Sequence, residues 1–459
     1  MTISELKVRS NPVPEIMQLT VTARHTSGEV HNFGGYVGYY KSYSMSSTLI
    51  FDNVKANTTR SGDKFTYGYG GGIGRINSNS YVLFDGFELT GATGCSSADG
   101  GVFGGLVGRA ENAFVAGTVN VKAYSDMYVG AAAAKATGNL VATDVNVTTE
   151  FTHSGSSAIV LGRLVGEADS NIGTISITNP TTATYGKFSG DIKDAVVNSA
   201  HSGNTGADSC FGGVIGKISQ SKTDADYSWT ISGVKLSGTI ENTSGKTAQK
   251  LGGVIACINS TNVDKETNAY RKTLTLSNVT AIGLTIEGNV SSENSELMSS
   301  GGIFGYAWYD TDVVVNGVTV GSSDTTSTVK VTGAADFGGM IYNATGKWRI
   351  PANGLTLTNI TIDATQATSF GMIINKGWYH PNSTDATPTG NVKTALQQQF
   401  PALYENGGAP TFGDIYLSKL SSKLTTFQAA TEGKTAVPSD YDFPVAGSTS
   451  VRLKTGYIR

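Results

Sequence analysis

The chain of 459 residues is poor in charge and in cysteine, and both shortages exclude classes of protein. Charged residues make up 15% of the sequence, the formal net charge is −3, and no basic run occurs. We therefore expect no nucleic-acid partner, because neutralising phosphates requires a local surplus of Lys and Arg. The three cysteines, Cys95, Cys210 and Cys257, form no CxxC pair and cannot all be paired within one chain. They predict neither a zinc site nor a disulfide framework.

Long apolar runs are also missing. No segment approaches the roughly 18 consecutive apolar residues of a membrane-spanning helix, so we expect a chain that does not span a membrane. The first residues, MTISELKVRSNPVPE, lack the apolar core of a signal peptide. We expect that such a peptide either does not exist or lies outside this sequence.

Proline is scarce as well, at 10 residues, whereas glycine is abundant at 58. Ser, Thr and Asn fill the intervals between apolar runs, a composition that favours many short strands and turns over helices. The hydrophobic share of 39% is enough to bury one or two substantial cores. The composition therefore predicts an all-β fold.

A glycine-rich run of eight residues recurs ten times along the chain. The copies are FGGYVGYY (33–40), YGGGIGRI (69–76), FGGLVGRA (103–110), VGAAAAKA (129–136), LGRLVGEA (161–168), FGGVIGKI (211–218), LGGVIACI (251–258), SGGIFGYA (300–307), FGGMIYNA (337–344) and FGMIINKG (370–377). The second residue of each run, named here the first glycine, is Gly in every copy, and the residue three positions later is apolar in every copy. Such recurrence indicates a repeat protein.

The spacing of the runs predicts the architecture. Alternating apolar stretches such as LTLSNVTAIGLTIEG and GLTLTNITIDA follow the runs and indicate further strands. The first glycines are 26 to 50 residues apart, which is too irregular for a hexapeptide coil, and the shortest interval is too short for a four-stranded propeller blade. A parallel β-helix, or solenoid, of about ten rungs fits, because surplus length can leave the stack as loops. We expect it to be right-handed, from the general bias of parallel crossovers.

Three regions follow from this interpretation. Residues 1–30 are predicted to be an N-terminal cap or attachment segment, residues 31–382 the β-helix, and residues 383–459 a C-terminal cap or the start of a next module. The last region contains LSKLSSKLTTFQAA (417–430), whose apolar spacing is compatible with a helix.

Equivalent positions of successive copies form columns along a β-helix. We expect the column of first glycines to allow bends with positive φ and packing too close for a Cβ, and the apolar column to fill the core. Apolar residues at two successive positions cannot share one face of a strand. We therefore expect a strand covered on both faces, followed by a corner at the next glycine. Arg163, which replaces the second glycine of its run, is then expected to point outward.

Runs of the FGGLVGRA type resemble the glycine-leucine-hydrophobic-glycine (GLUG) repeat of large bacterial surface proteins. The segments GGVI at 212–215 and 252–255 are similar to repeats of polymorphic outer-membrane adhesins. The resemblance covers residues 30–380. It implies surface attachment and adhesion, and it transfers no catalytic residue.

Signatures of catalysis are weak. The sequence has no HxH or HExxH spacing, no GxSxG elbow and no calcium-binding GGxGxD run, so we expect no metal site and no cofactor. Right-handed β-helices often carry polysaccharide lyases and hydrolases, which use aspartate clusters. Asp310 and Asp312 are two residues apart, about 6.6 Å on a strand, which is compatible with an inverting carboxylate pair. We keep them as candidate catalytic residues beside the simpler interpretation of solvated loop residues.

Two outward-facing groups are candidate ligand-binding sites. Five positions after the first glycine, successive copies carry Arg75, Arg109 and Lys135. These cations suit an acidic glycan or an anionic surface, unless Glu167 of the next copy pairs across the rungs. Aromatic residues gather in the last three copies, where they suit sugar faces or seal the end of the solenoid. They are Trp308, Trp348, Trp378 and Tyr379.

These observations favour a non-enzymatic, extracellular β-helix of a bacterial cell-surface protein, which contacts a glycan or a neighbouring surface. A phage tail spike or fibre, self-associated as a trimer and located in the virion, is the first alternative, because a chain that begins at Met1 without a signal peptide suits assembly in a virion. A polysaccharide lyase or glycoside hydrolase on the same fold is the second.

Overall fold

The structure is a computed structural model. It describes residues 5–9, 18–24, 30–41, 48–52, 55–61, 65–77, 81–93, 102–124, 128–153, 160–169, 187–199, 209–219, 227–242, 249–259, 272–287, 299–308, 311–322, 327–330, 336–338, 341–345, 347–349, 354–357, 360–364, 369–371, 374–378, 411–412, 415–420, 426–428, 441–442 and 451–453. Strands and short bends make up these residues, and no helix occurs among them. The predicted all-β class is confirmed for this part of the chain.

The strands form three sheets. The 22-stranded sheet contains β1 (Glu5–Arg9), β2 (Gln18–Arg24), β4 (Val37–Tyr40), β5 (Thr48–Asp52), β6 (Lys55–Ser61), β8 (Ile73–Ile76), β9 (Tyr81–Thr93), β11 (Val107–Tyr124), β13 (Ala133–His153), β15 (Val165–Asp169), β16 (Lys187–Ser199), β18 (Ile215–Ser219), β19 (Tyr227–Asn242), β21 (Ile255–Asn259), β22 (Lys272–Glu287), β24 (Phe304–Trp308), β25 (Thr311–Val320), β28 (Ile341–Thr345), β29 (Lys347–Arg349), β30 (Leu355–Leu357), β33 (Ile374–Trp378) and β34 (Thr411–Phe412). The 11-stranded sheet contains β3 (Val30–Gly34), β7 (Phe65–Gly70), β10 (Val102–Gly104), β12 (Tyr128–Gly130), β14 (Val160–Gly162), β17 (Ser209–Gly212), β20 (Gln249–Gly252), β23 (Ser299–Gly301), β27 (Asp336–Gly338), β32 (Ser369–Gly371) and β36 (Thr426–Gln428). The five-stranded sheet contains β26 (Ser327–Lys330), β31 (Ile360–Ala364), β35 (Ile415–Leu420), β37 (Tyr441–Asp442) and β38 (Val451–Leu453).

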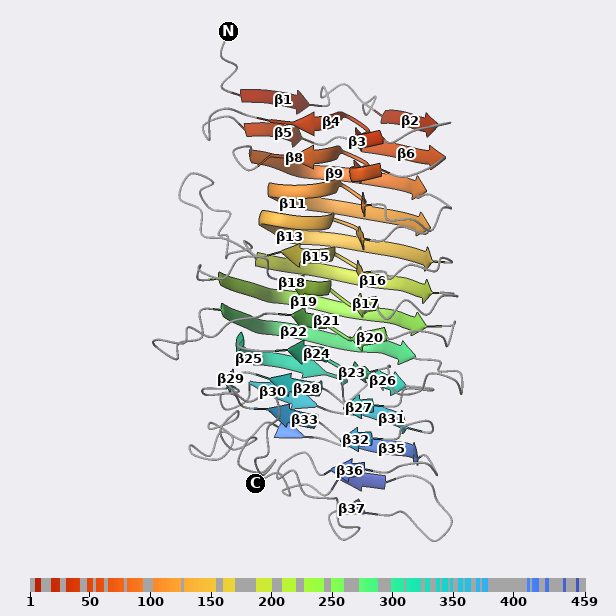
Figure 1. The fold of residues 1–459 in the computed structure, drawn as a ribbon, viewed down its shortest axis with the longest axis vertical. Coiled ribbons are helices and arrows are strands. Elements are labelled where there is room, and N and C mark those ends of the chain that lie inside the picture. The colour runs from red at the N-terminus through yellow and green to blue at the C-terminus, as the bar shows by residue number, and fades with distance from the viewer. Residues whose placement is uncertain are drawn as a thin grey trace.

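The strands lie across the long axis of the molecule and are stacked in chain order, from β1 at one end to β37 at the other (Figure 1). Each copy of the repeat contributes a short strand to the 11-stranded sheet, which follows the order of the copies without a crossover. The pairings between copies are parallel, and antiparallel pairing joins only β38 to β35 and β37 among the described strands. This arrangement is compatible with the predicted β-helix. We call the strands of one copy a layer.

The predicted columns are present in the strand register. Gly70 pairs with Gly34 on one side and with Gly104 on the other, and Gly212 pairs in the same way with Gly162 and Gly252. The apolar column three positions later runs from Val37 through Ile73, Val107, Ala133, Val165, Ile215, Ile255, Phe304 and Ile341 to Ile374. Its members from Ile73 to Ile341 are buried, so this column forms part of the core.

A bend lies at a different place from the one expected. The first strand of a layer ends at the first glycine, the next two residues bend, and the second strand begins at the apolar column, as in β10, Gly105–Leu106 and β11. Because the bend interrupts the alternation, Leu106 and Val107 are both fully buried although they are adjacent. The expectation of a strand covered on both faces with a corner at the following glycine is therefore wrong. Backbone hydrogen bonds join successive bends, such as Leu106 N–H to Ala131 C=O at 2.9 Å.

The first glycines are required by close packing. A Cβ built on Gly104 would collide with the carbonyl oxygen of Val107, on the far side of the bend, and the equivalent collision recurs at Gly212 and Gly252. Positive φ occurs at other described glycines, which lie in or directly after the long strands. They are Gly233, Gly238, Gly283, Gly317 and Gly321. The expectation of positive φ in the first-glycine column is wrong, and the expectation of packing too close for a Cβ is confirmed.

Arg163 also departs from the prediction, because its side chain is fully buried and does not point outward. The guanidinium Nη1 donates a hydrogen bond to the carbonyl oxygen of Ser237 in β19 of the next layer. A Cβ built on Gly213, the equivalent position of that layer, would lie 3.7 Å from Nη2 of Arg163. At the bend this position faces inward, so the arginine occupies space beside a glycine and bonds to the adjacent layer.

Parallel pairing continues at both ends of the stack. β1 and β2 pair with β5 and β6, and β34, β35 and β36 pair with β30, β31 and β32. The helical interpretation of residues 417–430 is wrong for its described residues, which lie in β35 and β36. Among the described residues, no helix has the length and apolarity needed to span a membrane.

Candidate functional site

The residues five positions after the first glycine form a column along the 22-stranded sheet. Arg109 on β11 pairs with Arg75 on β8 and with Lys135 on β13, so these three predicted residues are neighbours on adjacent strands. Tyr39 precedes Arg75, and Glu167 follows Lys135. Adjacent strands are about 4.8 Å apart, which sets three like charges close together and favours a counter-charge between them.

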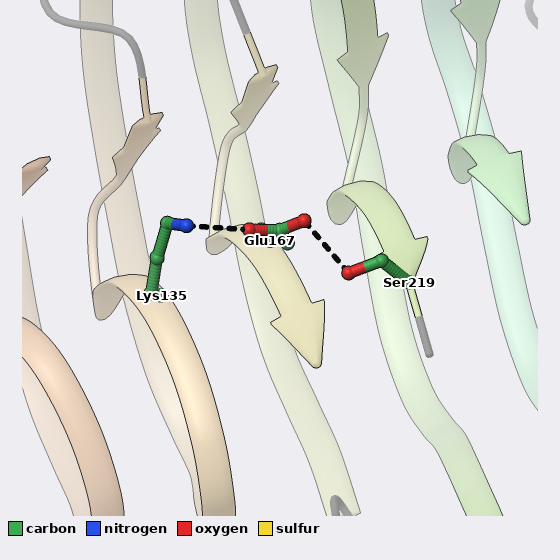
Figure 2. Close-up of polar contacts among 3 residues, drawn as sticks. All are labelled: Lys135, Glu167 and Ser219. Carbon is green, nitrogen blue, oxygen red and sulfur yellow. Dashed lines mark hydrogen bonds and ion pairs between the residues drawn. The ribbon is translucent and has the colours of Figure 1, made fainter. Parts of the chain in front are cut away.

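Lys135 has that counter-charge. Its Nζ lies 2.9 Å from Oε2 of Glu167, and the Ser219 hydroxyl donates a hydrogen bond of 2.7 Å to Oε1 (Figure 2). The three residues come from β13, β15 and β18, so the carboxylate joins three successive layers. The side chains of Lys135 and Glu167 are only 16% and 10% exposed. The interpretation that Glu167 pairs across the layers is confirmed here, and the charge of Lys135 is used within the protein.

Arg75 and Arg109 form the positive part of the column. Both side chains are partly buried. The guanidinium carbon of Arg75 lies 5.6 Å from the ring centroid of Tyr39, a cation–π distance. Tyr39 is 45% exposed. Two planar cations and an exposed aromatic ring therefore adjoin one another at the surface of the first three layers. We name Tyr39, Arg75 and Arg109 the arginine face.

Two other tyrosines of the first copy, one in the bend and one at the end of β4, are affected by burial. Burial raises the pKa of Tyr36 to about 12, and burial also raises the pKa of Tyr40. The ring of Tyr36 packs edge-on against Phe51 at 5.4 Å between centroids. Burial disfavours the charged phenolate, so these two phenols stay neutral at moderately alkaline pH.

The predicted aromatic group is divided between strands. Trp308 ends β24 and Trp378 ends β33, and both stand four residues after the apolar column of their layers. Trp348 lies on β29, which pairs with β25, and is in register with Val313. The backbone thus places Trp308 and Trp378 in one column and Trp348 on a different strand. Tyr379 lies outside the described residues.

The candidate catalytic pair is described only in part. Asp312 lies on β25, in register with Thr273 and Lys347, and Asp310 lies outside the described residues. Within the part of the chain that the structure describes, no group of three His, Cys, Asp or Glu side chains is arranged to hold a metal ion.

One cluster was missed by sequence reasoning. Cys210 and Cys257, 47 residues apart in the sequence, are in one buried cluster with Val160 and Ala256. The signal was present in the repeat, because Cys210 stands two positions before one first glycine and Cys257 five positions after the next. The two positions differ within the repeat, so an alignment of like positions does not bring the two cysteines together.

The chain matches no known family model, no curated protein and no solved structure.

Proposed function

We propose that this protein is a right-handed parallel β-helix of about ten rungs with terminal caps, and that it acts as a non-enzymatic rod at a bacterial cell surface. We also propose that it is related to the GLUG-repeat surface proteins. Its main support is the register of the copies, since glycine pairs with glycine from layer to layer in the order of the chain. A stack that depends only on neighbouring layers suits a spacer, because length can be added one layer at a time.

The ligand that the arginine face suits best is an acidic glycan. Guanidinium groups present planar forks of donors that match carboxylate and sulfate groups. Arg75 and Arg109 are neighbours on adjacent strands, so together they can engage two anionic groups along one oligosaccharide. The exposed ring of Tyr39 offers a flat surface for a sugar. Lys135 contributes less, because Glu167 already pairs with it.

Binding is tested with an array of sulfated, uronate-containing and neutral glycans. We expect the wild type to bind acidic glycans. The double variant Arg75→Gln, Arg109→Gln should bind them more weakly, with a Kd about tenfold higher or more. Added salt should weaken the wild-type complex, because the contacts are ionic. Lys235→Gln, which removes an exposed lysine on β19, is the matched control and should bind as the wild type does.

Two results would overturn the ligand proposal: binding of neutral glycans as strong as that of acidic ones, or unchanged affinity in the double variant. The same array is read with Trp308→Ala. Loss of binding in this variant would assign the ligand to the aromatic residues of the last layers, which also include Trp348, Trp378 and Tyr379. Unchanged binding would leave it with the arginine face. The molar mass in solution is measured in parallel, since a monomer fits a surface rod and a trimer favours a tail fibre.

A further inference from the structure

A diagonal contact recurs between successive layers. The residue two positions before the first glycine of one layer meets the residue five positions after the first glycine of the next. A Cβ built on Gly68 would lie 3.2 Å from the backbone nitrogen of Arg109. The Lys250 ammonium lies 4.1 Å from the ring centroid of Tyr306. Cys210 and Cys257 occupy this same pair of positions, in the sixth and seventh layers.

Burial in a shared apolar cluster and strand pairing keep the two cysteines next to each other. Their exposed fractions are 0% and 3%, and they share a cluster with Val160 and Ala256, against which Tyr306 packs. Both are thiols in the structure, and the two thiols share a hydrogen bond. Strand pairing fixes both backbones, because Cys210 is in register with Lys250 and Cys257 with Lys217.

We propose that Cys210 and Cys257 form a disulfide that joins the sixth layer to the seventh when the protein meets an oxidising thiol–disulfide buffer. The proposal is independent of the ligand of the arginine face. The bond would act as a covalent clip between two layers that hydrogen bonds and packing otherwise hold.

The oxidant is a low-molecular-weight disulfide such as oxidised glutathione. The thiolate of Cys257, the less buried of the two, attacks one sulfur of the small disulfide and releases one small thiolate. The Cys210 thiolate then attacks the Cys257 sulfur of the mixed disulfide and releases the second small thiolate. Two protein thiols lose two protons and two electrons, and one small disulfide is reduced to two small thiols.

The environment of Cys210 determines when this reaction is fast. The hydrogen bond with Cys257, burial and the neighbouring Cys257 raise the pKa of the Cys210 thiol well above its ordinary value, although Lys250 and Lys217 oppose the shift. In the folded protein Cys210 therefore holds little thiolate at neutral pH, so its attack on the mixed disulfide is slow. The bond should form readily during refolding, before the two layers close over the sulfur atoms, and faster in the folded protein as the pH rises.

The test refolds the full chain in a mixture of reduced and oxidised glutathione and maps the peptides without reduction. We expect a linked peptide pair that contains Cys210 and Cys257, and an intact mass lower by two hydrogen atoms. Cys95→Ser is the matched control and should retain the link, whereas Cys257→Ala should lose it. The oxidised protein should unfold at a higher urea concentration than the same sample with reductant added.

Free thiols at both positions after refolding, or a link that contains Cys95 in place of either residue, would overturn the proposal. An equal urea midpoint with and without reductant would overturn the role as a clip. The wild type and Cys95→Ser carry the decision by themselves, so the test stands even if Cys257→Ala does not fold.

Discussion

At the scale of single residues, the backbone of this protein turns back on itself so tightly that a methyl group cannot be accommodated. The first glycines of the first seven copies, from Gly34 to Gly252, each face a carbonyl oxygen three residues later, across a bend. A backbone oxygen cannot rotate away as the end of a side chain can. Substitution at such a position therefore forces the bend to open, which also disturbs its hydrogen bonds to the next layer.

Gly252→Ala should accordingly destabilise the protein by about 3 kcal/mol or more. Besides the collision with the Ile255 carbonyl, the added Cβ would lie 2.8 Å from Cα of Ala256. Gly283→Ala, in the same layer, is the control. Its Cβ would meet nothing within 4 Å, so only its φ of 65° carries a cost, about 1 kcal/mol. Urea unfolding of both variants measures the difference, and equal losses would contradict the close-packing account.

At the scale of the strand, neighbouring layers are joined by side chains as well as by backbone hydrogen bonds. Glu167 on β15 reaches Lys135 on β13 and Ser219 on β18 (Figure 2). A partly buried carboxylate between two layers stabilises the stack only while its partners remain, because the desolvation of each charge must be offset.

Glu167→Gln should cost about 1 to 3 kcal/mol, since it leaves Lys135 partly buried without its carboxylate. Ser219→Ala should cost about 1 kcal/mol, because it removes one hydrogen bond and no charge. Chemical denaturation of the two single variants and the double variant measures the coupling. If Glu167→Gln cost no more than Ser219→Ala, the ion pair would not contribute to the contact between layers.

The strands and their columns were predictable because a parallel stack repeats its environment at every layer. Glycine recurs where Gly104 and Gly212 meet a carbonyl, and apolar residues recur where Val107 and Ile215 enter the core. The position of the bend was not predictable from alternation, since periodicity describes a continuous strand and fails where the chain turns. Alternation for this reason predicts an outward side chain at Arg163, which is buried.

The sequence predicts the arginine face only as a set of residues at the same position of successive copies. Its column follows from counting, whereas the pairing of Lys135 with Glu167, which separates it from Arg75 and Arg109, depends on side-chain reach. The contact between Cys210 and Cys257 is diagonal, between different positions of neighbouring copies, and a search for like positions passes over it.

At the scale of the whole molecule, interactions extend mainly to the layers above and below, so one layer should be removable. Deleting residues 251–299 joins Lys250 to Ser300, and Ser300 is the register partner of Leu251. We expect this variant to fold, with a melting midpoint within roughly 5 °C of the parent. Deleting residues 251–275 ends within a layer and should abolish cooperative unfolding. Circular dichroism with thermal melts compares the two, and an unfolded full-layer deletion would contradict the stacked architecture.

The strands lie across the long axis, so the hydrogen bonds between layers are directed along it (Figure 1). Tension applied to the two ends therefore pulls along these bonds. The hydrogen bonds between one pair of layers, here called a row, break before those of the next pair, and many rows are not sheared at once. Each row that yields releases a length of slack chain much longer than the thickness it occupied. A stack of this kind would extend in steps and dissipate mechanical work as each row opens.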